Sequence, residues 1–371
     1  SRSVTVVGSL LSDETRDEFM SRTRATYEKL RDRHESRTRR EKYLSITEAR
    51  SNPLRLSFSL DTDPKPRETG IRLFNQVTVS DLRPFIDWTP FFQAWEMKGK
   101  YPAILDDDKR GEAARRLFDD AKEMLDELTD GDLLVPKGVV GLFPAHSVGD
   151  DIVLEIEGGQ RLLHTLRQQS QKSKGKPNRA MADFVSPSSN EIQSHVGMFA
   201  VTSGHGVSEL VAAYEADHDD YRAILLKALA DRLVEAFAEY VHEVIRREIW
   251  GYEKLKRHSK DELIAEKYRG IRPAPGYPAQ PDHTEKETIW DILDVSSTTG
   301  MELTEHLAML PAASVCGLFF CHPKAAYFNV GKIARDQVAD YAKRKGFSMS
   351  TTEKWLESRL NYERVREGSS L

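Results

Sequence analysis

A proline-rich segment between Tyr268 and Glu285 combines the residue types of a rigid ligand-binding loop. Its prolines at positions 273, 275, 278 and 281 exclude a helix and stiffen the backbone, so that carbonyl and amide groups stay available to a polar ligand. Gly276 would let a ligand approach the backbone closely, and Arg272 could hold a carboxylate through two parallel hydrogen bonds. The same composition also suits a rigid structural turn, and the segment alone leaves both interpretations open.

Three carboxylates elsewhere in the chain could face such a ligand. Asp87 lies in an aromatic segment, Ile86 to Trp95, where it could accept hydrogen bonds from an ammonium group in a partly desolvated pocket. It could equally cap a short helix that begins at Trp88. Glu235 lies beside the apolar stripe of a long predicted helix, and Glu266 precedes the proline-rich segment. Each of these two is either solvated or directed into a cleft, and solvated glutamates are the commoner case.

Motifs of several other catalytic classes are missing from the sequence. The eleven histidines show no HExxH and no paired spacing typical of zinc sites, and there is neither a G-x-S-x-G element nor a P-loop. The stretch Ser203–Gly206 is too short for a dinucleotide fingerprint, and the glycine-rich loop of Rossmann-type methyltransferases is absent. Cys316 and Cys321 are five residues apart in a strand-like run, so they should point to opposite faces and remain reduced, which favours a cytosolic setting.

Size and composition narrow the class of protein further. The 371 residues suffice for one large domain or two medium ones, and 39% hydrophobic with 30% charged residues is typical of a soluble protein. A net charge of -5 is too small to indicate nucleic-acid or membrane-surface binding, and the longest apolar runs are too short to cross a bilayer. The N-terminus lacks a secretory signal, and a first residue of Ser rather than Met suggests a fragment of a longer chain.

The elements that must position these residues mix strands and helices without a βαβ rhythm. The clearest is a helix from Asp219 to Trp250, in which apolar residues recur at three and four positions. A capping box at Ser350–Glu353 predicts a final helix, and Gly346 the end of the one before it. The other expected elements are a strand at 4–11, a charged helix to about 40, an irregular linker at 45–70, and short strands at 77–79, 138–143, 151–156 and 196–202. The pattern predicts an α+β fold with antiparallel pairing.

Several segments, taken in order, resemble the activation domain of cobalamin-dependent methionine synthase over about residues 81 to 362. The clearest is Arg272-Pro-Ala-Pro-Gly-Tyr277 and its continuation to Lys286. The others are Asp87–Phe92 with Gly99–Pro102, Gly141–Ala145 with Gly149–Ile152, Asp219–Tyr221, Lys227–Glu239 and Asp336–Tyr341. The resemblance implies a curved domain on a bent antiparallel sheet flanked by helices, spanning residues 41–371, which holds S-adenosylmethionine in a shallow groove.

The resemblance also assigns roles to individual residues. Asp87 would bind the amino group of the methionine moiety, and Arg272 its carboxylate. Glu235 and Glu266 match carboxylates near the ligand. Phe328 stands where some relatives carry a tyrosine, so a hydroxyl contact would be lost there. The remaining expected contacts come from the loop backbone and from aromatic rings, at Pro273, Ala274, Gly276, Tyr277 and Tyr327.

The resemblance places the chain within a larger methyltransferase. Residues 1–40 would be the C-terminal strand and helix of the preceding cobalamin-binding domain, but the D-x-H-x-x-G segment that supplies the lower histidine of cobalt is absent. The homocysteine and folate modules are absent too. The fragment would therefore bind S-adenosylmethionine so that inactive cob(II)alamin, held by the cobalamin-binding domain of the same chain, is reductively methylated in the cytoplasm with an electron from a flavodoxin-type reductase.

Two other functions fit part of the sequence. A pure docking module that has lost cofactor binding is disfavoured because Arg272, Asp87 and Tyr277 are all retained. A free-standing small-molecule methyltransferase is disfavoured because the matched segments contain no candidate base. Two basic clusters could steer an acidic reductase, or could merely complement a helix end and keep a loop solvated. They comprise Arg246, Arg247, Lys254, Lys256, Arg257 and Lys260, and then Lys172, Lys174 and Lys176.

Overall fold

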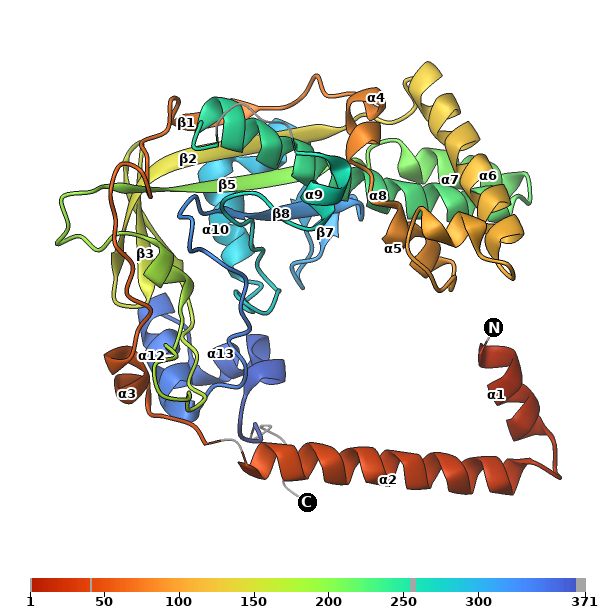
Figure 1. The fold of residues 1–371 in the computed structure, drawn as a ribbon, viewed down its shortest axis with the longest axis horizontal. Coiled ribbons are helices and arrows are strands. Elements are labelled where there is room, and N and C mark those ends of the chain that lie inside the picture. Colours follow the sequence, from red (N-terminus) through yellow and green to blue (C-terminus); the bar gives the residue numbers. More distant parts are fainter. Residues whose placement is uncertain (1, 41, 254–257, 365–371) are drawn as a thin grey trace.

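The computed structural model describes residues 2–40, 42–253 and 258–364 (Figure 1). Its centre is a six-stranded antiparallel sheet with the strand order β4-β3-β2-β5-β8, in which β1 also pairs with β2. The strands are β1 Gly70–Leu73, β2 Lys137–Val148, β3 Asp151–Ile156, β4 Gly159–His164, β5 Ser194–Thr202 and β8 Ser314–Phe319. Helices cover the sheet, so the predicted α+β class with antiparallel pairing is confirmed.

The long strand β2 makes the sheet bend. Its first part pairs with β1 and β5, whereas its last four residues, Ala145 to Val148, pair with β3. Pro144 lies at this change of partner, where it has no N–H to donate to either neighbour. The sheet curves here, so that β3 turns away from β5 in Figure 1.

Residues on β2 and β5 alternate between two hydrophobic cores. Val140 and Phe199 face one core, which α8 (Asp220–Val244) covers. Val139 and Met198 face the other, which α10 (Glu285–Leu293) and α11 (Val295–Thr299) cover. Both faces of these strands are therefore buried, which explains their nearly continuous apolar sequence. The other helices that follow residue 41 are α3 Ile46–Ser51, α4 Val79–Leu82, α5 Trp88–Ala94, α6 Gly111–Asp130, α7 Val207–Ala216, α9 Lys260–Ile264, α12 Arg335–Lys345 and α13 Met349–Trp355. A small hairpin joins β6 Glu302–Leu303 to β7 Met309–Leu310.

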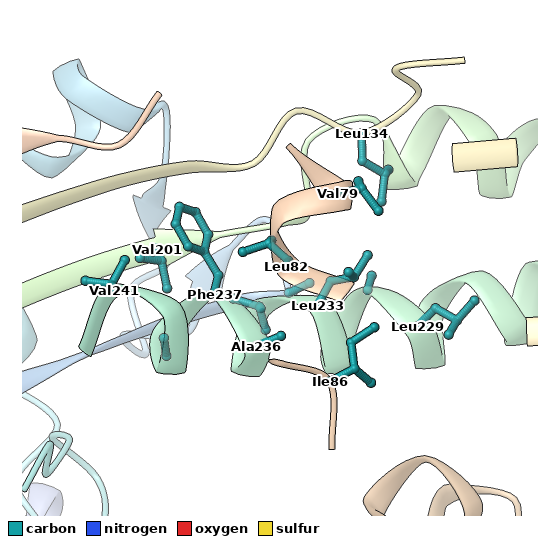
Figure 2. Close-up of a cluster of buried hydrophobic side chains, with 14 of the residues drawn as sticks. Val79, Leu82, Ile86, Leu134, Val201, Leu229, Leu233, Ala236, Phe237 and Val241 are labelled. Carbon is teal, nitrogen blue, oxygen red and sulfur yellow. The ribbon is translucent and has the colours of Figure 1, made fainter. Parts of the chain in front are cut away.

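The long helix predicted from the apolar spacing is confirmed as α8. Figure 2 shows its buried side chains, Leu233 and Phe237 among them, packed against Leu82 of α4 and Val201 of β5. A π-helical turn, Ile245–Ile249, continues α8 and brings the helical run close to the predicted end at Trp250. The expected match of Gly346 with a helix end is also confirmed, because it closes α12 in the left-handed conformation.

The N-terminal segment contradicts its predicted strand. Residues 4–11 lie in α1, Arg2–Leu11, which packs on α2, Arg16–Arg40, and Figure 1 shows α2 extending away from the sheet. β-Branched residues favour strands only where a neighbouring strand accepts the backbone hydrogen bonds, and a helix forms these bonds within itself. The assignment of residues 1–40 to a preceding domain stays a prediction.

Two local predictions were also wrong. Residues 77–79 form no strand, because Thr78 is the N-cap of α4 and its hydroxyl accepts a hydrogen bond from the amide of Asp81 at 3.3 Å. The last helix is capped by Ser348 rather than Ser350, through the amide of Thr351 at 3.0 Å. In both cases a side chain that satisfies free amides at the start of a helix fixed the boundary.

The two cysteines lie in different cores, as their spacing predicted. Cys316 belongs to the core under α10, and Cys321 to the core under α8; both are buried and reduced. Burial raises the pKa of the Cys316 thiol to about 12 and also raises the pKa of Cys321. Both side chains are therefore structural thiols. Among the described residues, no helix is long and apolar enough to cross a membrane.

Candidate functional site

Two adjoining cavities lie between α8, the segment around α9 and the proline-rich loop. The larger has a volume of about 560 Å³ and the smaller about 320 Å³, and both are lined by Glu235, Glu266 and Arg272. Because they share these three residues, the two cavities are together called the groove. Of the residues predicted from the sequence, the larger cavity adds Pro273, Ala274, Tyr277, Tyr327 and Phe328, and the smaller adds Asp87.

Gly276 is the one predicted site residue that lines neither cavity. Its φ is +95°, and a Cβ atom at this position would lie 2.3 Å from the ring of His283. The turn and the packing of His283 therefore both require a glycine here, and a contact of Gly276 with a ligand stays a prediction. Its amide closes the turn by donating to the carbonyl of Gln280 at 2.7 Å.

The proline-rich loop is held against the last strand of the sheet. Ile271 and Phe320 exchange backbone hydrogen bonds of 3.0 and 3.1 Å, and the amide of Leu318 donates to the carbonyl of Pro273 at 2.8 Å. The amide of Arg272 donates to the hydroxyl of Tyr327 at 3.1 Å. The loop thus enters the groove from a fixed position, and Tyr327 helps to hold it.

The guanidinium of Arg272 is anchored on one side by a buried polar cluster. Its Nη1 donates to Oε2 of Glu239 at 2.5 Å, to the hydroxyl of Tyr268 at 2.7 Å and to Nδ1 of His242 at 3.3 Å. Although burial opposes the charge, Glu239 and Tyr268 hold the pKa of Arg272 above its ordinary value. Burial, with Arg246 and Arg272 nearby, lowers the pKa of His242 well below its ordinary value, so this ring is neutral and able to accept.

Sequence reasoning missed this anchoring cluster. Glu239, His242 and Arg246 follow Glu235 on α8 and its π-helical continuation at intervals of four, three and four residues, so they lie along one face. All three are buried in the structure. The signal that could have found them is the polar stripe at helical spacing within a largely apolar helix.

Asp87 caps a helix and also borders the groove. Its Oδ1 accepts a hydrogen bond from the amide of Thr89 at 3.0 Å at the start of α5, which is the capping role that the sequence left open. Its Oδ2 makes no hydrogen bond to the described residues, and Asp87 lines the smaller cavity. One oxygen therefore serves the fold while the other is available to a cation.

The remaining predicted residues lie around the larger cavity. Tyr277 and Tyr327 are 61% and 42% exposed, so their rings form an open rim. Burial raises the pKa of both phenols, with Glu235 adding to the effect at Tyr277. Glu235 and Glu266 are exposed, and Glu266 has a left-handed φ of +51°, which is unusual for a non-glycine residue and occurs often at functional sites.

The predicted basic cluster near the end of α8 is wrong in part. Arg246 is fully buried between Glu239 and Glu253, and Arg247 donates to Glu243 at 2.8 Å, so neither presents a free positive charge. Lys254, Lys256 and Arg257 lie outside the described residues, as does the side chain of Lys260. In the second cluster Lys174 and Lys176 are exposed, while Lys172 donates to the hydroxyl of Ser170 at 2.8 Å.

A groove between a long helix and a stiffened loop, lined by rings and a few convergent charges, has the features typical of a small-molecule-binding site. Comparison with known proteins is more specific. The family model "Vitamin B12 dependent methionine synthase, activation domain" matches residues 78–346. A solved structure, the MetH reactivation domain bound to AdoHcy, is 48% identical with a TM-score of 0.83, over 86% of this chain and 99% of that chain. The chain belongs to the family of activation domains of vitamin B12-dependent methionine synthase.

Proposed function

We propose that this chain binds S-adenosylmethionine and supports the reductive methylation of inactive cob(II)alamin. The observation that carries the proposal is the single groove into which Arg272, Asp87, Glu235 and Glu266 converge. The similar MetH domain was solved with AdoHcy bound, which differs from S-adenosylmethionine by one methyl group and one charge.

The charges in the groove fit the ligand from end to end. All side-chain hydrogen bonds of Arg272 to described residues leave from Nη1, so Nε and Nη2 can take a carboxylate through two parallel bonds. Oδ2 of Asp87 can accept from the ammonium group beside that carboxylate. Glu235 and Glu266, which border both cavities, favour a sulfonium cation between the two ends.

The contribution of this chain to the reaction is positioning. Bound S-adenosylmethionine supplies an electrophilic methyl group, whose transfer to a strong nucleophile requires no general acid or base. The rim phenols of Tyr277 and Tyr327 keep their protons at neutral pH, since the ordinary pKa of a phenol is about 10 and burial raises it further at both residues. His242 lies behind Arg272 as a hydrogen-bond acceptor. These residues can therefore hold and orient the ligand without competing for the methyl group.

The partners follow from the same proposal. The cobalamin would be held by the cobalamin-binding domain of the same full-length chain, of which residues 1–40 would be the end. A flavodoxin-type reductase would supply the electron, and the reaction would take place in the cytoplasm. The complete methyltransferase activity, from 5-methyltetrahydrofolate to homocysteine (EC 2.1.1.13), would need the other modules of that chain.

Calorimetric titration with S-adenosylmethionine tests the first half of the proposal, and saturable one-to-one binding is expected. The second half is tested by mixing this chain with a separate cobalamin-binding module loaded with cob(II)alamin and a reductant. Methylcobalamin, followed by its absorbance, should form only when both this chain and S-adenosylmethionine are present. Absence of binding would favour the docking module, and methylation of a small molecule without cobalamin would favour the free-standing methyltransferase.

A further inference from the structure

The anchoring of Arg272 uses up one of its two terminal nitrogens. Nη1 carries two hydrogens and faces three acceptors, on Glu239, Tyr268 and His242. Tyr268 in turn donates to Oε2 of Glu239 at 3.5 Å, so the hydroxyl and the carboxylate hold the same nitrogen together. Rotation of the guanidinium would break these bonds, and its Nε–Nη2 edge therefore keeps one direction.

Glu239 is itself fixed from its other side. Its Oε1 accepts from Nη1 of Arg246 at 3.3 Å, and Arg246, fully buried, also donates from Nε to Glu253 at 2.9 Å. The guanidinium of Arg246 lies over the ring of Tyr268, 4.0 Å from the ring centre. Glu239 is 7% exposed, and both of its oxygens have a cationic partner. Its carboxylate has little freedom to move.

We propose that Glu239, assisted by Tyr268, is a positioning residue that holds Arg272 in the orientation needed to recognise the carboxylate of the ligand. The inference rests on the proposed function, because it assumes that Arg272 takes that carboxylate. Glu239 also lines the smaller cavity, but Arg272, Tyr268 and Arg246 occupy both of its carboxylate oxygens, so its effect on the carboxylate end of the ligand passes through the guanidinium. It thereby determines the preference of the groove for an amino-acid end over an end that lacks the carboxylate.

Two effects of Glu239 oppose each other. Its negative charge repels an incoming carboxylate, whereas its hydrogen bond aligns the group that binds that carboxylate. Arg246, buried against the opposite oxygen, offsets part of the repulsion, and for this reason alignment outweighs charge. The substitution Glu239→Asp separates the effects, because it keeps the charge but shortens the side chain by one methylene.

The test compares S-adenosylmethionine with decarboxylated S-adenosylmethionine, which lacks only the carboxylate, by calorimetry on the full chain. We expect the wild type to bind the decarboxylated ligand roughly 100-fold more weakly. In Glu239→Gln and Glu239→Asp this ratio should fall to about tenfold or less, and in Tyr268→Phe by about threefold. Affinity for the decarboxylated ligand itself should stay near the wild-type value, which a general loss of structure would not allow.

Glu243→Gln is the matched control, because Glu243 lies one turn further along α8, is equally buried and pairs with Arg247 instead. It should leave the ratio unchanged. Wild-type discrimination that persists in Glu239→Asp and Tyr268→Phe would overturn the inference, as would an equal loss of affinity for both ligands. Tyr268→Phe keeps the test decisive if the Glu239 variants fail to fold. A wild type that binds neither ligand would refute the proposed function itself, and one that binds both equally would refute the role of Arg272.

Discussion

The two ends of the proline-rich loop carry buried polar clusters of opposite kinds. At its start Arg272 uses Nη1 alone for hydrogen bonds to described residues and keeps an unused edge toward the groove. At its end Nζ of Lys345 donates all three of its hydrogens, to Asp282 at 3.0 Å, to Thr284 at 2.5 Å and to Glu285 at 2.6 Å. Asp282 also accepts from the hydroxyl of Tyr341 at 2.7 Å.

The difference separates the proposed ligand site from a cluster that only supports the structure. Although burial works to raise the pKa of Asp282, Lys345, Thr284 and Tyr341 hold it below its ordinary value. The cluster of Lys345, Asp282, Thr284, Glu285 and Tyr341 is called the closed cluster, because the side-chain donors of Lys345, Thr284 and Tyr341 are all used within it. It fastens the loop to α12 and has no free donor for a ligand. The cluster of Arg272, Glu239, Tyr268 and His242 is called the open cluster, because it fixes one side of the Arg272 guanidinium and leaves the other side available. Unused hydrogen-bond donors, more than burial, distinguish the end of the loop at which ligand binding is proposed.

The largest expected effect on stability comes from removing the cation of the closed cluster. Lys345→Met should lower the free energy of unfolding by about 3–5 kcal/mol, because it leaves Asp282 and Glu285 buried without their cation. Urea unfolding measures the change. Lys343→Met, an exposed lysine on the same helix, should stay within about 0.5 kcal/mol of the wild type. Equal stability of the two variants would show that the closed cluster does not support the fold.

Removing Arg272, the groove-lining cation of the open cluster, should weaken ligand binding and change stability little, which is the reverse of the effect at Lys345. Arg272→Ala should weaken S-adenosylmethionine binding by about 2–4 kcal/mol, or roughly 30- to 1000-fold, because a charge-assisted contact is lost. The melting temperature should change little, since Glu239 keeps Arg246 as its partner. An unchanged dissociation constant in a protein with an unchanged melting temperature would remove Arg272 from the site.

Lowering the pH should reduce the free energy of unfolding through His242 of the open cluster. Its folded-state pKa is lowered, so the unfolded chain takes up a proton below about pH 6.5 while the folded chain does not, and stability falls as pH drops toward the folded pKa. His242→Gln should therefore lose about 2 kcal/mol less unfolding free energy between pH 7 and pH 5 than the wild type.

His195 offers the comparison for that measurement. Burial, with Lys65 nearby, lowers its pKa to about 4, so His195→Gln should reduce the acid loss in the same sense. Because His195 lines neither cavity, its substitution should leave ligand affinity at pH 7 unchanged. A pH dependence of unfolding that is the same in the wild type and both variants would contradict the neutral, buried state of the two rings.

A smaller effect is expected at Asp87, whose Oδ1 caps α5 and whose side chain also lines the groove. Asp87→Ala should cost about 1 kcal/mol of stability through the lost cap, whereas Asp87→Asn should be nearly neutral. Binding should weaken by about tenfold in Asp87→Asn, which keeps an acceptor but no charge, and further in Asp87→Ala. Calorimetry beside thermal melts separates the roles, and normal binding by both variants would leave Asp87 as a cap only.

The smallest effect concerns the reductase and lies outside both clusters. If the exposed Lys174 and Lys176 steer an acidic partner, reversing both to Glu should slow reductase-driven remethylation by about twofold to fivefold at low salt. S-adenosylmethionine binding should not change, because neither lysine lines the groove. Equal rates for variant and wild type at low ionic strength, where screening is weakest, would exclude this loop as the docking site.

Patterns of short range were predictable because the physics behind them is local. The spacing of leucine and phenylalanine along α8, the prolines that stiffen the loop after Arg272 and the odd separation of Cys316 and Cys321 each constrain the backbone within a few residues. The same local logic failed at residues 4–11, where strand propensity counts only if a neighbouring strand is present. It failed at Thr78 for a similar reason, since a cap outweighed the β-branched run.

By itself the sequence determined the α+β class, the long helix, the rigid loop and, through family resemblance, the residues around the groove. Only the tertiary structure decided which residues contact one another around the groove. Glu239 and Arg272 are 33 residues apart, and their contact depends on how α8 lies against a loop attached to β8. Likewise, only the packing of His283 showed that Gly276 serves the turn. A buried ion pair depends on which elements exclude water together, and no window of sequence contains that information.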